Sequence, residues 1–468
     1  MNFLKEVILY KQKIFYDLLC IIFINLLFFT FFLNLNDFIF SILIDLLFVI
    51  SYFSLNFYKN SLNIKSKFFY IFVYFLFSLV LKNFFINNIF IEGLYLINII
   101  TFLLIILPRY FLNLELINNS FSNDYLSSKK NILVIGGLGY IGSHLVDDLL
   151  EENKSVTVLD CQMYGDEVLN KFSKNLNFKF IKAYASDVIA LSKAIKDSEI
   201  VVHLAGLVGD PACALDENET KYLNIKTTSI IQNLCSEYGI KKLIFASSCS
   251  VYGKSEDKIS NENSKLNPVS LYAQTKRDSE EELLNGKFTN VSIVRFATVF
   301  GHSFRERYDL VCNLFCAQAY YNKEITVEGG TQRRPFIHVK DAARSLKILI
   351  NTSKDIRKSI FNIGFDDQNY SIADIASQIK ENIKDTNIKY LKSLSDQRDY
   401  FVNFNKFNKT FNFSKTLDLK SGIQEIINNF ELKDKYWSYL NKKYSNKNTT
   451  EAFLSNFKGD KSEINNFN

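Results

Sequence analysis

The sequence predicts an α/β protein in which a doubly wound parallel sheet follows an all-α bundle of membrane-spanning helices. Two observations favour the sheet: short strand-like runs alternate with helical patterns after residue 130, and a glycine-rich turn follows the first run. Four apolar stretches in the first 110 residues favour the bundle. The predicted organisation is a transmembrane anchor over residues 1–110, a polar linker over 111–130, the α/β domain with a smaller C-terminal region over 131–430, and a polar tail over 431–468.

Each apolar stretch is close in length to the roughly 20 residues that a helix needs to cross a bilayer. The stretches cover about residues 14–34, 38–57, 68–86 and 88–107. Lysines precede the first stretch and separate the second from the third: Lys5, Lys11, Lys13, Lys59, Lys65 and Lys67. This bias predicts a multi-pass protein of the cell (inner) membrane, in contact with the lipid bilayer, whose N-terminus and α/β domain are cytoplasmic. Asp45 lies near the centre of the second stretch, where a functional carboxylate and a helix-helix hydrogen bond are both open interpretations.

Charge and cysteine content exclude some classes of partner. The formal net charge is +6 with no long basic block, which argues against a nucleic-acid partner. The seven cysteines include no Cys-x-x-Cys pair and no zinc-type cysteine and histidine spacing. We therefore expect reduced thiols and no metal site.

The glycine-rich turn joins the apolar run 132–135 to a helical pattern that begins near Gly142. Gly136 allows a tight turn, Gly139 lets a pyrophosphate approach the backbone, and Gly142 lets helix and strand pack closely. The next predicted strand ends in Asp160, where a carboxylate would accept hydrogen bonds from adenosine ribose hydroxyls. Because a carboxylate there repels the extra phosphate of NADP, the pattern predicts NAD.

Further strands are predicted at about 178–181, 199–204, 242–248 and 291–296. Ser248 closes the third of these, at an edge where ligands of such sheets bind. Tyr272 and Lys276 then stand four residues apart on a predicted helix and so share one face. An ammonium there would lower the pKa of the phenol, giving a general base for a sugar hydroxyl, and Ser248 could hydrogen-bond the same hydroxyl.

With these residues in view, residues from about 131 to 430 resemble the extended short-chain dehydrogenase/reductase family, the NAD-dependent nucleotide-sugar epimerases and dehydratases with a Rossmann fold. The resemblance rests on the glycine turn, His-Leu-Ala-Gly at 203–206, Ser-Ser-Cys-Ser-Val-Tyr-Gly at 247–253, Tyr-x-x-x-Lys at 272–276, Arg-Pro-Phe-Ile-His-Val-Lys-Asp at 334–341 and Phe-Asn-Ile-Gly at 361–364. It implies NAD as cofactor, a nucleotide-diphosphate sugar as substrate, and a homodimer.

The resemblance also implies roles for individual residues. The catalytic triad would be Ser248, Tyr272 and Lys276. The cofactor would contact Gly136, Gly139, Tyr140, Ile141, Gly142, Asp160, Asp187 (near the adenine), Leu204, Ala205, Gly206, Tyr272 and Lys276. Substrate contacts would come from Ser248, from Arg334 and Arg398 as phosphate-binding arginines, and from Asn313 as a weaker candidate.

The residues after Ser248 bear on the reaction. Similar 4,6-dehydratases carry Asp-Glu there, whereas this chain has Cys249 and Ser250, which favours a UDP-glucose 4-epimerase-like reaction. In that reaction a sugar hydroxyl is oxidised to a ketone, and the hydride returns to its other face. Thr298 departs from the Asn that such epimerases often carry. A 4,6-dehydratase or reductase stays open as the alternative, and a non-catalytic, membrane-tethered NAD-binding module is the alternative of another class.

The two ends of the chain complete the prediction. The membrane segment is similar to the four-span anchor of some bacterial polysaccharide-pathway dehydratases, which keeps dehydration open as the alternative and implies a role in surface polysaccharide biosynthesis. The interpretation of that segment as a transporter is weaker, because the spans are short and hold one central acid. From about residue 431 the chain is rich in Lys, Asn and Ser, and this composition predicts disorder over the last twenty or so residues.

Overall fold

The computed structural model describes residues 131–254, 257–392, 398–433 and 437–465, with side chains described as far as residue 455. The predicted membrane spans and the linker lie outside these residues. Within the described ranges, no helix combines the length and the apolar character that a membrane span requires. A boundary after Ser128 separates two units of the chain, and all of the described residues belong to the second unit.

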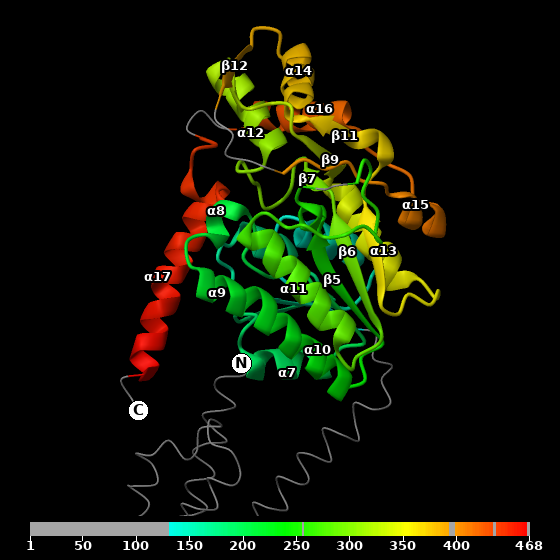
Figure 1. Cartoon of the computed structure of the whole chain (residues 1–468). Coiled ribbons are helices and arrows are strands. Elements are labelled where there is room, and N and C mark those ends of the chain that lie inside the picture. The colour runs from blue at the N-terminus through cyan, green and yellow to red at the C-terminus, as the bar shows by residue number, and fades with distance from the viewer. Residues whose placement is uncertain (1–130, 255–256, 393–397, 434–436, 466–468) are drawn as a thin grey trace, which may run out of the picture. The chain divides into compact units, whose positions relative to one another are not determined.

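The second unit is built on a seven-stranded sheet whose strand order is β10-β6-β5-β4-β1-β2-β3. All neighbouring pairs run parallel, which confirms the predicted parallel α/β sheet (Figure 1). The strands are β1 (Ile132–Ile135), β2 (Val156–Asp160), β3 (Phe178–Lys182), β4 (Ile200–His203), β5 (Lys242–Ser248), β6 (Val291–Phe296) and β10 (Ser359–Ile363). Most of their residues are buried, as expected when helices cover both faces of a parallel sheet.

Two groups of helices cover the two faces of the sheet. One face packs against α5 (Gly142–Glu151), α6 (Glu167–Phe172) and α13 (Val339–Asn351), and its core includes Leu145, Leu149 and Leu346. The opposite face packs against α7 (Val188–Lys196), α10 (Thr227–Glu237) and α11 (Leu271–Asn285), and its core includes Leu191, Ile231 and Leu283. The short helices α8 (Asp210–Cys213) and α9 (Glu217–Lys221) and a π-helical turn (Tyr222–Lys226) precede α10.

The strand order reverses beside β1, which pairs with β2 on one side and with β4 on the other. The connections after β1 and β4 therefore leave in opposite directions and open a crevice at the carboxyl ends of the strands. This crevice is where ligands bind in doubly wound sheets.

A smaller region with its own core follows β6 in the chain. It contains a three-stranded sheet of β7 (Thr298–Phe300), β9 (Arg333–His338) and β11 (Asn369–Ser371), and a two-stranded sheet of β8 (Glu324–Glu328) and β12 (Asn387–Leu391). Its helices are α12 (Val311–Ala317), α14 (Ile372–Asn382) and α16 (Leu419–Glu431), whereas α15 (Asn405–Phe411) packs on β10 of the large sheet through Phe407. Phe336, Ile375 and Ile423 lie in the core of this region.

A buried ion pair joins α11 to the sheet. Arg295 on β6 contacts Glu280 on α11 at 2.6 Å, and both side chains are almost fully buried. The Ser247 hydroxyl on β5 donates to the same carboxylate. Because breaking such a pair leaves an unpaired charge inside the protein, the pair fixes α11 against the ends of β5 and β6.

The C-terminal tail differs from the disordered segment that its composition predicts. Trp437 donates to the Tyr444 hydroxyl at 2.9 Å, and both rings pack around Tyr308. A helix, α17, then spans Asn446–Asn465, contacts α8, and buries Leu454 (Figure 1). The aromatic side chains are the physical reason for this difference, since Trp437 and Tyr444 pack, partly buried, against the core of the smaller region and so offset part of the entropy of ordering a polar segment.

Candidate active site

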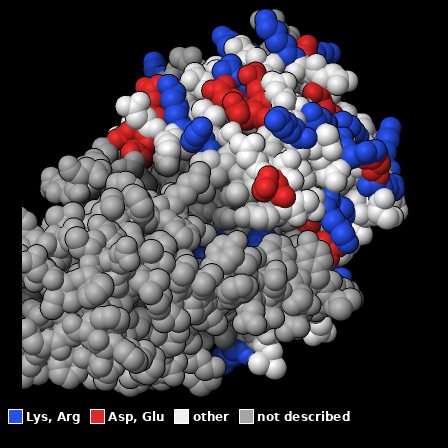
Figure 2. Space-filling model, turned by 90° about the horizontal axis from the view of Figure 1, so that it is seen from below, with Lys and Arg blue, Asp and Glu red and all other residues white. Residues whose placement is uncertain are grey.

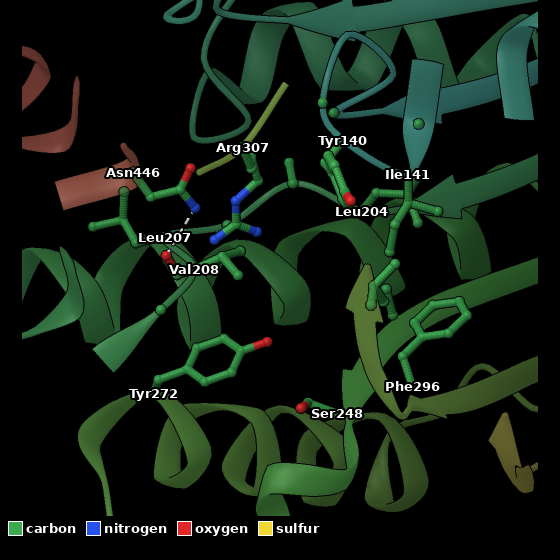
Figure 3. A pocket seen from close by; sticks show the side chains of 18 of the residues that line it. Tyr140, Ile141, Leu204, Leu207, Val208, Ser248, Tyr272, Phe296, Arg307 and Asn446 are labelled. Carbon is green, nitrogen blue, oxygen red and sulfur yellow. Dashed lines mark hydrogen bonds between the residues drawn. The ribbon is translucent and has the colours of Figure 1, made fainter. Parts of the chain in front are cut away.

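A cavity lies at the carboxyl ends of the central strands, and the glycine turn, the ends of β4 and β5, and α11 form much of its wall. In Figure 3, Tyr272 and Ser248 point into the cavity from one side, while Arg307 and Asn446 approach it from the other. The glycine turn and the predicted catalytic group, which are more than 100 residues apart in the chain, thus meet in one site.

The glycine turn is packed too closely to accept side chains at two positions. Gly136 has a φ of +84°, and a Cβ there would lie 2.7 Å from the backbone nitrogen of Ala205. A Cβ at Gly142 would lie 2.5 Å from the carbonyl oxygen of Gly136. At Gly139 the nearest such atom is 3.2 Å away, and this glycine lines the cavity. The turn therefore presents bare backbone to the cavity at the start of α5, where amide groups and the helix dipole favour phosphate.

Asp160 ends β2 and also lines the cavity. Its carboxylate accepts hydrogen bonds from the backbone N–H groups of Leu138, at 3.1 Å, and Gln162, at 2.8 Å. Burial raises the pKa of this carboxyl, while the two backbone hydrogen bonds act in the opposite direction. The contact with Leu138 ties the end of β2 to the glycine turn, so the two halves of the predicted dinucleotide site are held together.

The structure brings Ser248, Tyr272 and Lys276 together at the cavity. Ser248 is the last residue of β5, and its hydroxyl accepts a hydrogen bond from the Ser250 N–H at 3.1 Å. Tyr272 and Lys276 lie on α11, which begins after Ser270, a residue whose side chain accepts a hydrogen bond from the Ala273 N–H. The Lys276 ammonium donates to the carbonyl of Ala246 on β5 at 2.7 Å.

The pKa of Tyr272 differs from the sequence expectation. Burial raises the pKa of the phenol, the Cys213 thiol adds to this rise, and a hydrogen bond with the Ser248 side chain opposes it. The Lys276 nitrogen is 5.9 Å from the ring centroid, and its hydrogen bond holds it to β5. Desolvation therefore outweighs the lowering that the spacing of the two residues predicts, and the net pKa of the phenol is raised.

The Lys276 ammonium yields a prediction for pH dependence. Burial lowers the pKa of Lys276 to about 8, so the side chain loses its proton as pH rises through that value. If the charged form supports catalysis, we expect kcat/KM for product formation to fall above that pH. In Lys276→Arg the guanidinium stays charged, so the residual activity should keep its value to higher pH. A pH profile of both proteins checks this, and the same falling limb in both would contradict it.

The other predicted cofactor residues divide into two groups. Tyr140, Ile141, Leu204, Ala205 and Gly206 line the cavity. Asp187 does not lie among the described lining residues; it is exposed and caps α7, accepting hydrogen bonds from the N–H groups of Ile189 and Ala190, both at 3.0 Å. An adenine contact through its side chain would compete with this cap.

Two of the predicted substrate residues lie outside the cavity lining. Asn313 is buried, and its amide group donates to the Tyr140 hydroxyl at 3.0 Å and to the Arg307 carbonyl at 2.9 Å, while its oxygen accepts from the Gly301 N–H at 3.0 Å. These bonds use the amide within the protein, and the substrate contact of Asn313 stays a prediction. Arg334 is buried and donates to the carbonyl of Arg398. Arg398 itself lines the cavity and contacts Asp210 at 3.1 Å.

The sequence prediction missed three polar residues of the cavity: Arg305, Arg307 and Asn446. The two arginines follow β7, so the end of another strand near the sheet was the signal that could have found them. Arg307 makes two hydrogen bonds of 3.0 Å to Asp309. Asn446 belongs to the tail, where no local pattern points to a site.

The two residues after Ser248 face different ways. The Cys249 thiol donates to the Arg295 carbonyl at 3.3 Å and does not lie among the cavity-lining residues that the structure describes. Ser250 and Thr298 do line the cavity, and the Ser250 hydroxyl is buried without a hydrogen-bond partner in the described part of the chain. Asp160, at the predicted adenosine end, is the one carboxylate among these lining residues.

Comparison with known proteins gives consistent matches. Residues 132–364 match the model of the NAD dependent epimerase/dehydratase family. An uncharacterized UDP-glucose epimerase, YtcB, of Bacillus subtilis is 30% identical over 248 residues, which are 50% of this chain and 76% of that protein. The dTDP-D-glucose 4,6-dehydratase of Mus musculus is 28% identical over 272 residues, 56% of this chain and 75% of the relative. The UDP-glucuronic acid 4-epimerase of Bacillus cereus, solved with UDP-glucuronic acid and NAD, is 27% identical with a TM-score of 0.59, covering 64% of this chain and 99% of that one.

Proposed function

Because the chain belongs to the NAD-dependent epimerase/dehydratase family, we propose that it is a nucleotide-sugar epimerase of the UDP-glucose 4-epimerase type. One observation favours an epimerase over a 4,6-dehydratase within this family. Among the described residues that line the cavity, Asp160 is the one carboxylate, and it lies at the glycine turn. A 4,6-dehydration needs a further acid and base at the sugar, whereas an epimerisation needs one group that takes and returns a proton.

The cofactor of the chain is NAD, as in its structural relatives. The residues present fit this cofactor: Gly136, Gly139 and Gly142 leave a backbone cradle that a Cβ would fill, and the Asp160 carboxylate stands at the end of β2. When bound, NAD supplies reversible hydride transfer at a sugar carbon. The lysine beside the cradle, Lys276, is available to hold a ribose hydroxyl.

In the proposed mechanism Tyr272 takes the proton from a sugar hydroxyl and later returns it. Ser248 supports both states, because its hydroxyl can accept a hydrogen bond from the alcohol or donate one to the ketone. The protonated phenol is the resting form, since burial raises the pKa of Tyr272. Proton removal is therefore favoured by nearby positive charge: Arg307 lowers the pKa of the phenol, and the Lys276 ammonium lies 5.9 Å from the ring centroid. The ketone must turn over in the cavity between the two steps, and no further residue needs to react.

At the other end of the substrate, arginines would hold the nucleotide diphosphate. Arg398 and Arg307 line the cavity, each held by a carboxylate partner, Asp210 and Asp309 respectively. A planar guanidinium suits phosphate oxygens because it offers paired donors. The Bacillus cereus relative binds UDP-glucuronic acid, which supports a UDP-sugar as the first substrate to test.

We also propose that the apolar stretches of residues 1–110 anchor the enzyme in the cell membrane with the cytoplasm on its catalytic side. The lysine bias and the length of these stretches support this. An anchor would bring the product close to membrane-bound polysaccharide assembly, and a homodimer is the proposed assembly. Membrane flotation of the full chain tests the anchor, since a protein that stays at the bottom of the gradient would contradict it.

The function is tested by NMR of the products that the purified full-length protein forms from UDP-, GDP-, CDP- and dTDP-sugars without added reductant. An epimer formed without net change in NAD is the expected result. A 4-keto-6-deoxy sugar would replace the proposal by a dehydratase, for which relatedness to the mouse enzyme is the supporting observation. A folded protein with bound NAD that converts none of the sugars would favour a reductase or a non-catalytic NAD-binding module.

A further inference from the structure

Arg305 is a buried cation in the wall of the cavity. Its residue is 4% exposed, and its Nε is buried without a hydrogen-bond partner within the described residues. The guanidinium carbon lies 3.7 Å from the centroid of the Tyr164 ring. One terminal nitrogen donates to the Asn446 side-chain oxygen at 2.7 Å. The guanidinium therefore rests on an aromatic face and a neutral amide.

The charge of Arg305 is balanced less well than that of the other arginines in the cavity. Arg307 and Arg398 each form an ion pair, with Asp309 and Asp210 respectively. No carboxylate in the described part of the chain lies within ion-pair distance of Arg305. Burial accordingly lowers the pKa of Arg305, to about 10, although nearby Tyr164 and Asp309 counteract the shift. A buried guanidinium with neutral partners favours an anion as its missing partner.

Asn446 connects this arginine to two other parts of the site. Its side-chain nitrogen donates to the Val208 carbonyl at 3.0 Å, as drawn in Figure 3, and its backbone N–H donates to the Asp309 carboxylate at 3.1 Å. The residue is 3% exposed and begins α17. Farther along α17, the ring of Phe453 lies edge-on to Tyr184, with centroids 5.5 Å apart. The C-terminal tail therefore contacts the cavity wall at Asn446 and again at Phe453.

The position of Arg305 limits which anion it can reach. Tyr164 comes from the segment between β2 and α6, just after Asp160, and Tyr140, which lines the same cavity, belongs to the glycine turn. Arg305 therefore lies near the predicted dinucleotide site and also near Arg307, a guanidinium proposed to hold the substrate diphosphate. The dinucleotide and the nucleotide sugar each carry a diphosphate.

We propose that Arg305 binds a diphosphate oxygen of a nucleotide in this cavity, and that Asn446, from the C-terminal tail, is the positioning residue that aims it. The proposal rests on the proposed function for the presence of two nucleotides. A neutral asparagine holds the guanidinium in place and leaves its charge for the phosphate, whereas an aspartate would neutralise it. The C-terminal helix is then a part of the active site.

Equilibrium binding of NAD and of UDP to the purified full-length protein, stripped of bound nucleotide, tests the proposal. We expect Arg305→Gln to raise the Kd for one of these ligands by about 10- to 100-fold, the range for a lost charge-assisted hydrogen bond. Arg305→Lys should retain part of the affinity and its salt dependence. Ser455→Ala, an exposed position of α17, is the matched control and should change neither Kd.

Two variants at position 446 separate positioning from a purely structural role. Asn446→Asp keeps an acceptor for Arg305 but supplies a counter-charge, so it should weaken binding at least as much as Asn446→Ala does. If the asparagine only braced the fold, the aspartate variant would bind better than the alanine variant, and the proposal would be wrong. Thermal melting of each variant accompanies the binding data, so that a loss of fold is recognised.

The outcome also identifies the source of the phosphate. A raised Kd for NAD assigns Arg305 to the cofactor diphosphate, and a raised Kd for UDP assigns it to the substrate diphosphate. Unchanged Kd values for both, in folded Arg305→Gln, would overturn the proposal. The failure of the proposed function is distinguishable, because the wild-type protein would then bind NAD and UDP without forming an epimer.

Discussion

Replacing Tyr272 with phenylalanine is expected to lower kcat for epimer formation by about 10²- to 10⁴-fold, the usual contribution of a general acid or base. The variant removes only the hydroxyl, so the ring still packs against the cluster that contains Leu207 and Leu223 in the wall of the cavity. The melting temperature and the Kd for NAD should therefore stay close to their wild-type values. Product NMR and NAD titration on the full-length protein measure the two effects separately.

The control for this variant is Tyr390→Phe, which removes a hydroxyl from an exposed tyrosine on β12. Ser248→Ala is the companion change, and its effect should be smaller, because Ser248 supports the reacting oxygen without taking its proton. If Tyr272→Phe kept more than about a tenth of the wild-type kcat, the general base would be another group. The proposed mechanism would then lose its central step.

The sequence alone predicted the parts of the fold and of the site that depend on local patterns. β1, the glycine turn and the start of α5 occupy a single short stretch, and Asp160 follows at the end of the next strand. The same holds for Tyr272 and Lys276, whose spacing on one helix face brings both to the cavity. Ser248 could be placed because the end of a parallel strand in such a sheet lies at the ligand edge.

Other features depend on contacts that a linear pattern does not contain. Asn446 donates to the carbonyl of Val208, which is 238 positions earlier in the chain. No pattern in the polar tail indicates this contact. Asn313 and Asp187 carry suitable side chains for ligand contact, but the protein uses them for its own hydrogen bonds. Only the folded chain shows which polar groups are already occupied.

The pKa of Tyr272 is another property that a linear sequence pattern does not predict. Helical spacing correctly places an ammonium near the phenol, yet the spacing says nothing of how deeply both groups are buried. Desolvation raises the pKa of the phenol and lowers that of Lys276, and both effects depend on burial in the folded chain. Proximity along a helix is therefore a weaker predictor of charge state than burial.

Alanine substitutions in the glycine turn are the second change for which we expect a large effect. Two of the glycines, Gly142 and Gly139, should differ in whether alanine lowers the stability of the protein or only its affinity for NAD. In Gly142→Ala the new Cβ would meet backbone atoms of Gly136 at 2.5 Å and of Gly137 at 2.8 Å. Neither contact can relax by a side-chain rotation, so the turn itself must shift. We expect a loss of about 1–3 kcal/mol in the free energy of unfolding, together with loss of detectable NAD binding, because the phosphate cradle moves with the turn.

Gly139→Ala is the matched variant in the same turn. Its Cβ would approach only the Gly136 carbonyl, at 3.2 Å, and would stand in the cavity. It should leave the melting temperature nearly unchanged and still weaken NAD binding, since the methyl group occupies the path of the pyrophosphate. Thermal melting without ligand and NAD titration of both variants check this pair. The explanation by close packing would be wrong if Gly142→Ala kept both its stability and its NAD affinity. The turn would then be able to move aside for the new methyl group despite the close contacts.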